Sequence, residues 1–206
     1  MEIYEPGRVY ENIVKMFGYR NVVLRGAQLT EDQLAQALNN YEYAIVIGEK
    51  TVNGATVECY VVIIAPGSKY SNKSQDFKKL TKYVPTKDVP IEVMFVSKSP
   101  LTVHVKKQLA LYRSENPKYY VEDHDYEMFI IEKPRDVSVP KHVIATEKEV
   151  SAYCERHFTT KDKLPRINPM DPQAVWIGLK LGMVAKIYRL SETAGEAIVY
   201  RYCSIK

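Results

Sequence analysis

The chain has 206 residues, of which 46% are hydrophobic and 26% charged, and this balance is typical of a globular protein that buries a sizeable core. Its length exceeds that of an average domain, so we expect two small domains. The apolar runs are too short to cross a bilayer and the first residues lack the pattern of a secretory leader, so neither a membrane protein nor a secreted one is expected.

The formal charge of +4 is unevenly distributed along the chain. Residues 138–206 contain 11 Lys and Arg against 7 Asp and Glu, whereas residues 1–137 contain 18 of each. Such a bias indicates either a solvated basic surface or a patch for nucleic acid. Cys59, Cys154 and Cys203 are widely separated and odd in number, which predicts reduced thiols in the cytosol or nucleus.

The first third of the chain predicts two helices, over about Pro6 to Phe17 and over Thr30 to Leu38. In the second helix, Thr30 and Gln33 have the spacing of a capping box. Two strands rich in Val, Ile and Tyr are then expected, over Tyr43 to Ile47 and Val57 to Ile64, with a tight hairpin turn at Asn53-Gly54.

A polar, lysine-rich connection leads to a short buried strand over Ile91 to Val96. Ser99 and Pro100 have the residue types of an N-cap and a first helical position, which predicts a helix from Ser99-Pro100. Its apolar face would hold Leu101, Val105, Leu109 and Tyr112. A last strand of this part is expected at Met128 to Ile131, and the alternation of strands and helices predicts an α/β layer.

A linker between Pro134 and Pro140 places the expected domain boundary between residues 137 and 138. Thr146 and Glu149 form a second capping box, and the helix after it has an apolar face. That face comprises Val150, Tyr153, Cys154 and either His157 or Phe158. Asp171-Pro172 opens a further helix that Gly178 can close. Two antiparallel strands follow, Met183 to Arg189 and Ala197 to Cys203, with a turn over Ser191 to Gly195.

The sequence carries no glycine-rich phosphate loop, and its four histidines have no metal-ligand spacing, so no cofactor or metal is expected. His124, between Asp123 and Asp125, is either part of an acid/base cluster or, as we prefer, in an exposed acidic turn. A nuclease whose metal-binding carboxylates lie on a β-strand needs an acidic residue that is followed two positions later by lysine. Neither Glu58 nor Glu92 is followed in this way.

Two basic features could contact nucleic acid. The first is a run of lysines interleaved with Tyr70, Phe77 and Tyr83, and it either follows a phosphate backbone or forms the wet face of a helix. Its members are Lys69, Lys73, Lys78, Lys79, Lys82 and Lys87. The second is the corner Lys98-Ser99-Pro100, where a helix N-terminus beside a lysine could attract an anion or could simply be capped.

The last third of the chain resembles the C-terminal domain of the fifth subunit shared by the eukaryotic nuclear RNA polymerases, a family that also has archaeal members. The likeness covers most of residues 138 to 202 and rests on an ordered series of residues. The series comprises His142, Pro165, Arg166, Asp171, Pro172, Gly178, Lys180, Gly182, Arg189, Ser191, Glu192, Thr193 and Gly195.

This resemblance implies a compact α+β assembly domain in residues 138–206 that docks on the largest polymerase subunit through these residues. It implies for residues 1–137 an α/β jaw domain with a small mixed sheet, similar in fold to restriction-type nucleases but without their active site. Lys98-Ser99-Pro100 would lie where the family carries a loop near downstream DNA, with Lys73, Lys78, Lys79 and Lys82 as further DNA-proximal residues.

The leading hypothesis is therefore a non-catalytic subunit of a multisubunit DNA-dependent RNA polymerase that positions downstream double-stranded DNA. A free-standing transcription adaptor and, less well supported, a nuclease-like enzyme are the alternatives. Departures from cellular versions, such as Leu181 and Leu190, suggest a homologue from a large cytoplasmic DNA virus. The expected location is then the infected cytoplasm and the virion, or the nucleus for a cellular protein. The expected partners are the other polymerase subunits, with no membrane and no homo-oligomer.

Overall fold

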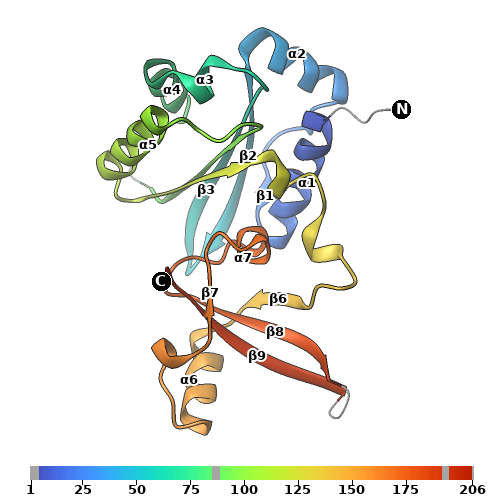
Figure 1. The fold of residues 1–206 in the computed structure, drawn as a ribbon, viewed down its shortest axis with the longest axis vertical. Helices are drawn as coiled ribbons and strands as arrows, with labels where there is room; N and C mark the ends of the chain where they lie inside the picture. Colours follow the sequence, from blue (N-terminus) through green and yellow to red (C-terminus); the bar gives the residue numbers. More distant parts are fainter. Residues whose placement is uncertain (1–4, 85–88, 192–194, 206) are drawn as a thin grey trace. The chain divides into compact units, whose positions relative to one another are not determined.

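The computed structural model describes residues 5–84, 89–191 and 195–205. The chain forms two compact units that meet in sequence between Ile131 and Glu132 (Figure 1). Each unit combines helices with its own sheet, so the expected α+β class is confirmed. The division by contacts lies upstream of the boundary expected from the sequence, because the short 3₁₀ helix Lys133–Arg135 belongs with the second unit.

The N-terminal unit is built on a mixed sheet with the order β1-β2-β3-β4-β5. Its strands are β1 (Val23–Leu24), β2 (Tyr43–Val52), β3 (Ala55–Ile64), β4 (Ile91–Ser97) and β5 (Tyr119–Asp125). The first three strands pair antiparallel and the last three pair parallel. The expected hairpin turn is present, with Asn53 at φ 51° and Gly54 at φ 79°.

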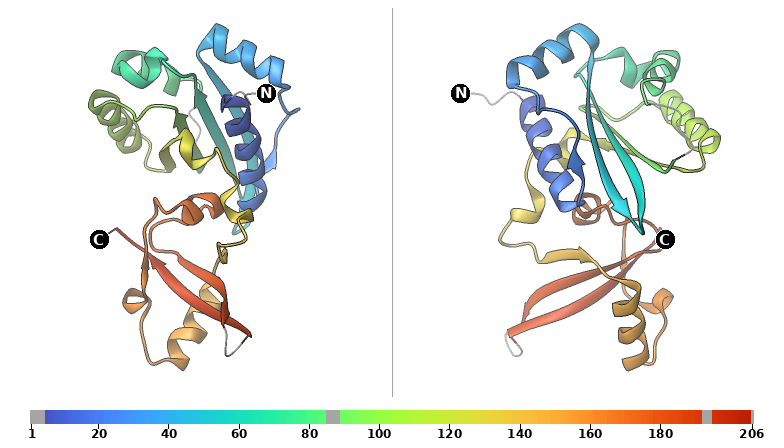
Figure 2. Two further views of the ribbon diagram at one scale, coloured as in Figure 1. Left: turned by 45° about the vertical axis from the view of Figure 1, so that its right-hand side comes forward. Right: turned by 180° about the vertical axis from the view of Figure 1, so that it is seen from behind.

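Helices cover both faces of this sheet (Figure 2). They are α1 (Glu5–Tyr19), α2 (Glu31–Tyr41), α3 (Lys69–Asn72), α4 (Ser74–Thr81) and α5 (Val103–Glu115). β4 is buried along its whole length and β3 from Val57 onward, as is usual for strands of a parallel sheet that is covered on both sides. The capping box predicted for α2 is present, with Thr30 accepting from the Gln33 amide and Gln33 accepting from the Thr30 amide.

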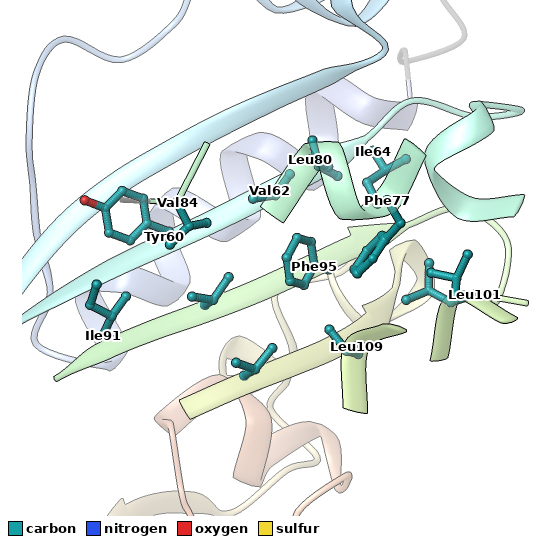
Figure 3. Packing of buried hydrophobic residues seen from close by; sticks show 13 residues of the cluster. Tyr60, Val62, Ile64, Phe77, Leu80, Val84, Ile91, Phe95, Leu101 and Leu109 are labelled. Atoms are coloured by element: carbon teal, nitrogen blue, oxygen red, sulfur yellow. The ribbon is translucent and has the colours of Figure 1, made fainter. Parts of the chain in front are cut away.

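On one face, α4 and α5 pack against alternate residues of β3 and β4 to form the main core (Figure 3). Phe77 of α4 lies 4.9 Å, ring centre to ring centre, from Phe95 of β4, and both rings are fully buried. Val105 and Leu109 of α5 complete the layer, as their helical spacing predicts. The lysine-rich connection therefore carries a helix anchored by Phe77, one of the aromatic residues interleaved among the lysines.

The segment after β5 corrects one prediction. Met128 to Ile131 is not a strand, because the chain turns into a 3₁₀ helix at Tyr126–Met128. The Tyr126 side chain is buried, and its hydroxyl donates to the carbonyl oxygen of Ile64 at 2.6 Å. This bond holds Tyr126 at the end of β3, and the chain does not continue β5 beyond Asp125.

The C-terminal unit has a four-stranded sheet with the order β6-β8-β9-β7. Its elements are β6 (Lys141–Ile144), α6 (Glu147–Arg156), a 3₁₀ helix (Lys161–Lys163), β7 (Arg166–Ile167), α7 (Pro172–Ile177), β8 (Val184–Ser191) and β9 (Gly195–Cys203). β8 and β9 pair antiparallel as predicted, and the turn residues Glu192 to Ala194 lie outside the described residues.

Two small cores hold this sheet, one under each helix. Ala174 and Ile177 of α7 pack with Ile187, whereas Val150 of α6 packs with Val184 on the other side. The single tryptophan, Trp176 in α7, is completely buried.

The caps predicted for both helices are present. Thr146 and Glu149 form the capping box of α6, Asp171 accepts from the Gln173 amide at the start of α7, and Gly178 ends that helix at φ 70°. The apolar face of α6 is shorter than expected, since Phe158 follows the helix with 98% of its side chain exposed and His157 is exposed as well.

We predict that Gly48→Ala destabilises the protein by about 1–3 kcal/mol, since an added methyl group overpacks a filled core. A Cβ atom at Gly48 would lie 2.5 Å from Val22 Cγ1 and 2.9 Å from Phe17 Cε2, under α1. Urea unfolding of the full chain measures the effect. Gly18→Ala is the control, because it is exposed in α1 with nothing within 4 Å, and this variant should be as stable as the parent or more so. Equal stability of both variants would contradict the packing argument.

Candidate nucleic-acid interface

One edge of the N-terminal sheet brings together the basic features that the sequence suggested. In the strand register, Tyr43 pairs with Ile64, Ile64 with Ser97, and Ser97 with Asp125. The carboxyl ends of β3, β4 and β5 and the start of β2 therefore form one row, which we call the carboxyl edge. Loops at this edge of a parallel sheet are a common position for ligand sites.

The loop after β4 corrects the predicted helix start. α5 begins at Val103 with Thr102 as its N-cap, and the Thr102 side chain makes no capping bond. The Thr102 amide instead donates to the Ser71 carbonyl at 3.2 Å, and Leu101 is buried in the core. With these tertiary contacts the helix starts after Thr102, so Ser99-Pro100 does not offer the free amides of a helix N-terminus.

Lys98, Ser99 and Pro100 are all exposed at the carboxyl edge. The Lys98 ammonium forms an ion pair with Glu5 at the start of α1. A phosphate would therefore have to compete with this carboxylate for Lys98. The same loop reaches α3, because the Thr102 hydroxyl donates to the Asn72 carbonyl at 3.3 Å. This bond places Lys73, the next residue, beside the loop.

The lysines of α3 and α4 form an exposed surface, here called the lysine surface: Lys69, Lys73, Lys78, Lys79 and Lys82. Lys69 pairs with Glu42 at 3.3 Å, and Lys79 pairs with Asp76 one helical turn earlier at 3.0 Å. Within the described part of the chain, Lys73, Lys78 and Lys82 make no ion pair. Lys87, the sixth lysine of this run, lies outside the described residues.

The carboxylates considered for a nuclease site lie on opposite faces of the sheet. Glu58 accepts from the Tyr60 hydroxyl at 2.8 Å on the face covered by α4 and α5. Glu92 accepts from Lys50 at 2.8 Å on the other face, with both side chains nearly buried. Two metal-binding carboxylates must share one face, so this pair cannot form such a site. Among the described residues, no group of three or more His, Cys, Asp or Glu side chains could hold a metal ion.

His124 is not in an exposed acidic turn, which corrects the preferred interpretation. It lies in β5 and is buried, with its ring 6.2 Å edge-on from Phe129. Its charged neighbour is Glu122, two positions earlier and on the same face, at 3.8 Å. Glu122 is in turn bound by Arg20 at 3.1 Å. Sequence reasoning missed this cluster because Arg20 is more than a hundred positions away.

The C-terminal residues that carried the resemblance are mostly turn, cap and surface positions. Asp171, Pro172 and Gly178 begin and end α7, and Gly182 has φ 84° in the turn before β8. His142 Nδ1 lies 2.6 Å from the Pro140 carbonyl, and burial lowers the pKa of its imidazole.

Of the remaining residues of this set, Pro165, Arg166 and Arg189 are exposed and Lys180 is half-buried. Ser191 ends β8, where it pairs with Gly195, while Glu192 and Thr193 lie outside the described residues.

Comparisons with known proteins match the C-terminal unit to one domain family and nearly the whole chain to viral proteins. The sequence-family model described as RNA polymerase Rpb5, C-terminal domain, matches residues 132–203. Over 198 residues, 95% of each chain, the sequence is 27% identical to the DNA-directed RNA polymerase RPB5 homolog of African swine fever virus, isolate Pig/Kenya/KEN-50/1950. The chain is thus similar over almost its whole length to a viral RPB5 homolog, and its last third matches the Rpb5 C-terminal domain. The relationship to viral members that was expected from the sequence is confirmed.

A cellular Rpb5 relative matches only part of the chain. The subunit rpabc1 of DNA-directed RNA polymerases I, II and III from Dictyostelium discoideum is 34% identical over 110 residues, which is 53% of this chain and 55% of that protein. The viral Rpb5 relatives thus extend the likeness through the N-terminal unit. No helix in the described residues is long and apolar enough to span a membrane.

We predict that Glu122→Gln destabilises the protein by about 3 kcal/mol at neutral pH, because it removes the carboxylate charge that faces the buried Arg20 guanidinium. Burial alone would raise the pKa of Glu122, but the Arg20 charge and then His124 outweigh burial and lower the pKa to about 2. Ionised Glu122 therefore stabilises the fold above its unfolded pKa of about 4.3, and this contribution is lost as the pH falls toward 2.

The measurement is urea unfolding of the full chain at several pH values. The difference between parent and Glu122→Gln should shrink between about pH 4 and pH 2. Exposed Glu127 gives the control, since Glu127→Gln should match the parent at neutral pH. A pH-independent difference for Glu122→Gln would show that shape, and not charge, causes the effect.

Proposed function

We propose that this chain is a non-catalytic subunit of a multisubunit DNA-directed RNA polymerase. The observation that supports the proposal most is the likeness over 95% of the chain to proteins named as RPB5 homologs of such a polymerase. The pairing of Glu92 with Lys50 and of Glu58 with the Tyr60 hydroxyl is consistent with a role without catalysis. In this proposal residues 132–206 anchor the subunit and the N-terminal unit positions downstream DNA.

The surface of the C-terminal unit supports an anchoring role on the largest subunit. Arg189 is exposed near the end of β8, and Leu190 beside it exposes 96% of its side chain. An exposed leucine next to arginine suits a protein interface, where arginine and apolar side chains are enriched. The excess of basic residues in residues 138–206 favours an acidic partner surface.

The carboxyl edge of the N-terminal unit supports contact with duplex DNA. Lys98 and the lysine surface supply several positive charges on loops and short helices at or near the end of one sheet. Lysines bind phosphate oxygens without reading base edges, so the contact should be independent of sequence. Duplex phosphates remain accessible along both strands, and this suits a subunit that guides DNA of any sequence.

We predict that Arg189→Glu weakens association with the largest polymerase subunit severalfold, because it reverses a charge in the proposed docking surface. Purification through a tag on the full chain, in increasing salt, measures the retained subunits. Arg156→Glu is the matched control, since Arg156 is also exposed in the same unit but lies outside the residues of the resemblance. Complete dissociation of the parent at moderate salt would favour a free-standing adaptor instead.

We predict that Lys98→Ala lowers the salt dependence of DNA binding by the assembled polymerase by about one unit of log K against log salt. Sequence preference should not change. Lys118→Ala is the control, because Lys118 precedes Tyr119, which pairs with Ile91 at the opposite end of the sheet. A photo-crosslinker at Ser99 should label downstream DNA. Labelling of protein alone would exclude DNA contact at this loop.

A further inference from the structure

Four tyrosines from separate elements converge beside the lysine surface and form what we call the tyrosine platform. Tyr43 at the start of β2 lies at the centre, with ring-centre distances of 5.1 Å to Tyr83, 5.7 Å to Tyr70 and 6.5 Å to Tyr41. Tyr70 meets Tyr43 edge-on at 83°, while Tyr83 is tilted by 36°. Such offset and edge contacts are the favourable geometries of aromatic pairs.

A single carboxylate links the segment of Tyr41 and Tyr43 to the start of α3, which carries Tyr70. Glu42, between α2 and β2, adopts a left-handed backbone conformation at φ 62°, and the two neighbouring rings, Tyr41 and Tyr43, lie together at 6.5 Å. Its carboxylate accepts from the Ser68 hydroxyl at 2.9 Å and from both the amide and the ammonium of Lys69 at 3.3 Å. These bonds fix the start of α3, and with it Tyr70, against β2. The Ser68 bond is the main reason that the pKa of Glu42 is lowered.

Two tyrosines of the platform expose more than half of their surface to solvent. Tyr41 exposes 64% of its surface and Tyr83 55%, although Tyr83 is held by α4, whose Phe77 and Leu80 are fully buried. The centre of the platform is protected, since Tyr43 is half-buried. Exposed tyrosine rings packed beside a half-buried one suit the stacking of a flat ligand.

Several lysines lie around the platform. The Lys69 ammonium lies 5.4 Å from the centre of the Tyr70 ring, and Lys82 immediately precedes Tyr83. Lys73 and Lys82 are exposed and make no ion pair with a described residue. The carboxylates in this region are occupied, that of Glu42 by Ser68 and Lys69 and that of Asp76 by Lys79. Cations that flank open aromatic rings are complementary to a ligand with flat rings and phosphates.

We propose that the tyrosine platform binds an unpaired strand of nucleic acid, with bases stacked on Tyr83 and Tyr41 and phosphates on Lys73 and Lys82. Bases within a duplex already stack on one another, so only unpaired bases can use the rings. This site shares Lys73 and Lys82 with the duplex contact proposed at Lys98 and the lysine surface, but it differs from that contact because it needs aromatic faces as well as charge. It does not depend on that contact being present.

The test uses the full chain and a short oligo-dT that carries one 2-aminopurine, whose fluorescence is quenched when the base stacks. We expect the oligonucleotide to bind with strong quenching. Tyr83→Ala should weaken binding about tenfold and remove most of the quenching, in line with the stacking free energy of one base. Tyr83→Phe should preserve both, because the ring is retained. Lys82→Ala should weaken binding in a salt-dependent way and leave the quenching at saturation unchanged.

The same strand as RNA and as a duplex completes the design. Stronger binding of RNA or of DNA identifies the nucleic acid, and equal binding assigns the platform to unpaired strands of either kind. Binding of the duplex should be insensitive to Tyr83→Ala. Tyr41→Ala, at an exposed helix end, repeats the test independently of Tyr83. Absence of binding, binding without quenching, or equal loss with Tyr83→Phe and Tyr83→Ala would overturn the proposal. Loss of a polymerase subunit with Tyr83→Ala, without oligonucleotide binding, would instead assign the surface to a protein.

Discussion

The parallel register of β3, β4 and β5 is the constraint on which the N-terminal unit depends. It aligns Ile64, Ser97 and Asp125 in one row, and the antiparallel hairpin adds Tyr43 to the same row. Because the central strands are buried on both faces, helices must cover each side, and the connections to those helices leave from this row. A shift of β4 by one residue would reverse its faces and also move Lys98.

Charged side chains have different roles in the interior and on the surface of the N-terminal unit. Glu92 and Glu122 are nearly buried and each contacts a cation from another element, Lys50 or Arg20, so these carboxylates serve the fold. Buried pairs of this kind add little net stability over apolar residues, yet losing one partner is costly. On the surface of this unit, several lysines of α3 and α4 have no carboxylate partner among the described residues and are available to an external anion.

Local signals in the sequence predicted the elements whose ends are held by local bonds. The capping boxes at Thr30 and Thr146 and the Asn53-Gly54 turn are in place because their hydrogen bonds join residues three positions apart or less. The start of α5 could not be predicted, since the bond from Thr102 to Ser71 overrides the Ser99-Pro100 signal. Burial of His124 likewise depends on distant elements.

The candidate site was predictable only in part. The lysines are visible as a run, and their exposure follows from the buried spacing of Phe77 and Leu80. The convergence of Tyr41, Tyr43, Tyr70 and Tyr83 could not be predicted, because it brings together segments distant in sequence through ring contacts with Tyr43 and through the bond of Glu42 to Ser68. Single-sequence patterns carry no information on which turns meet, whereas the strand register does.

Trp176 gives the two units separate optical signatures. It is the only tryptophan of the chain, and its indole is fully buried in α7. Its emission spectrum therefore reports on the packing around α7, while near-ultraviolet tyrosine signals also follow the N-terminal unit. When the two transitions differ along a denaturant series, the units unfold independently; when they coincide, unfolding of the chain is cooperative across both.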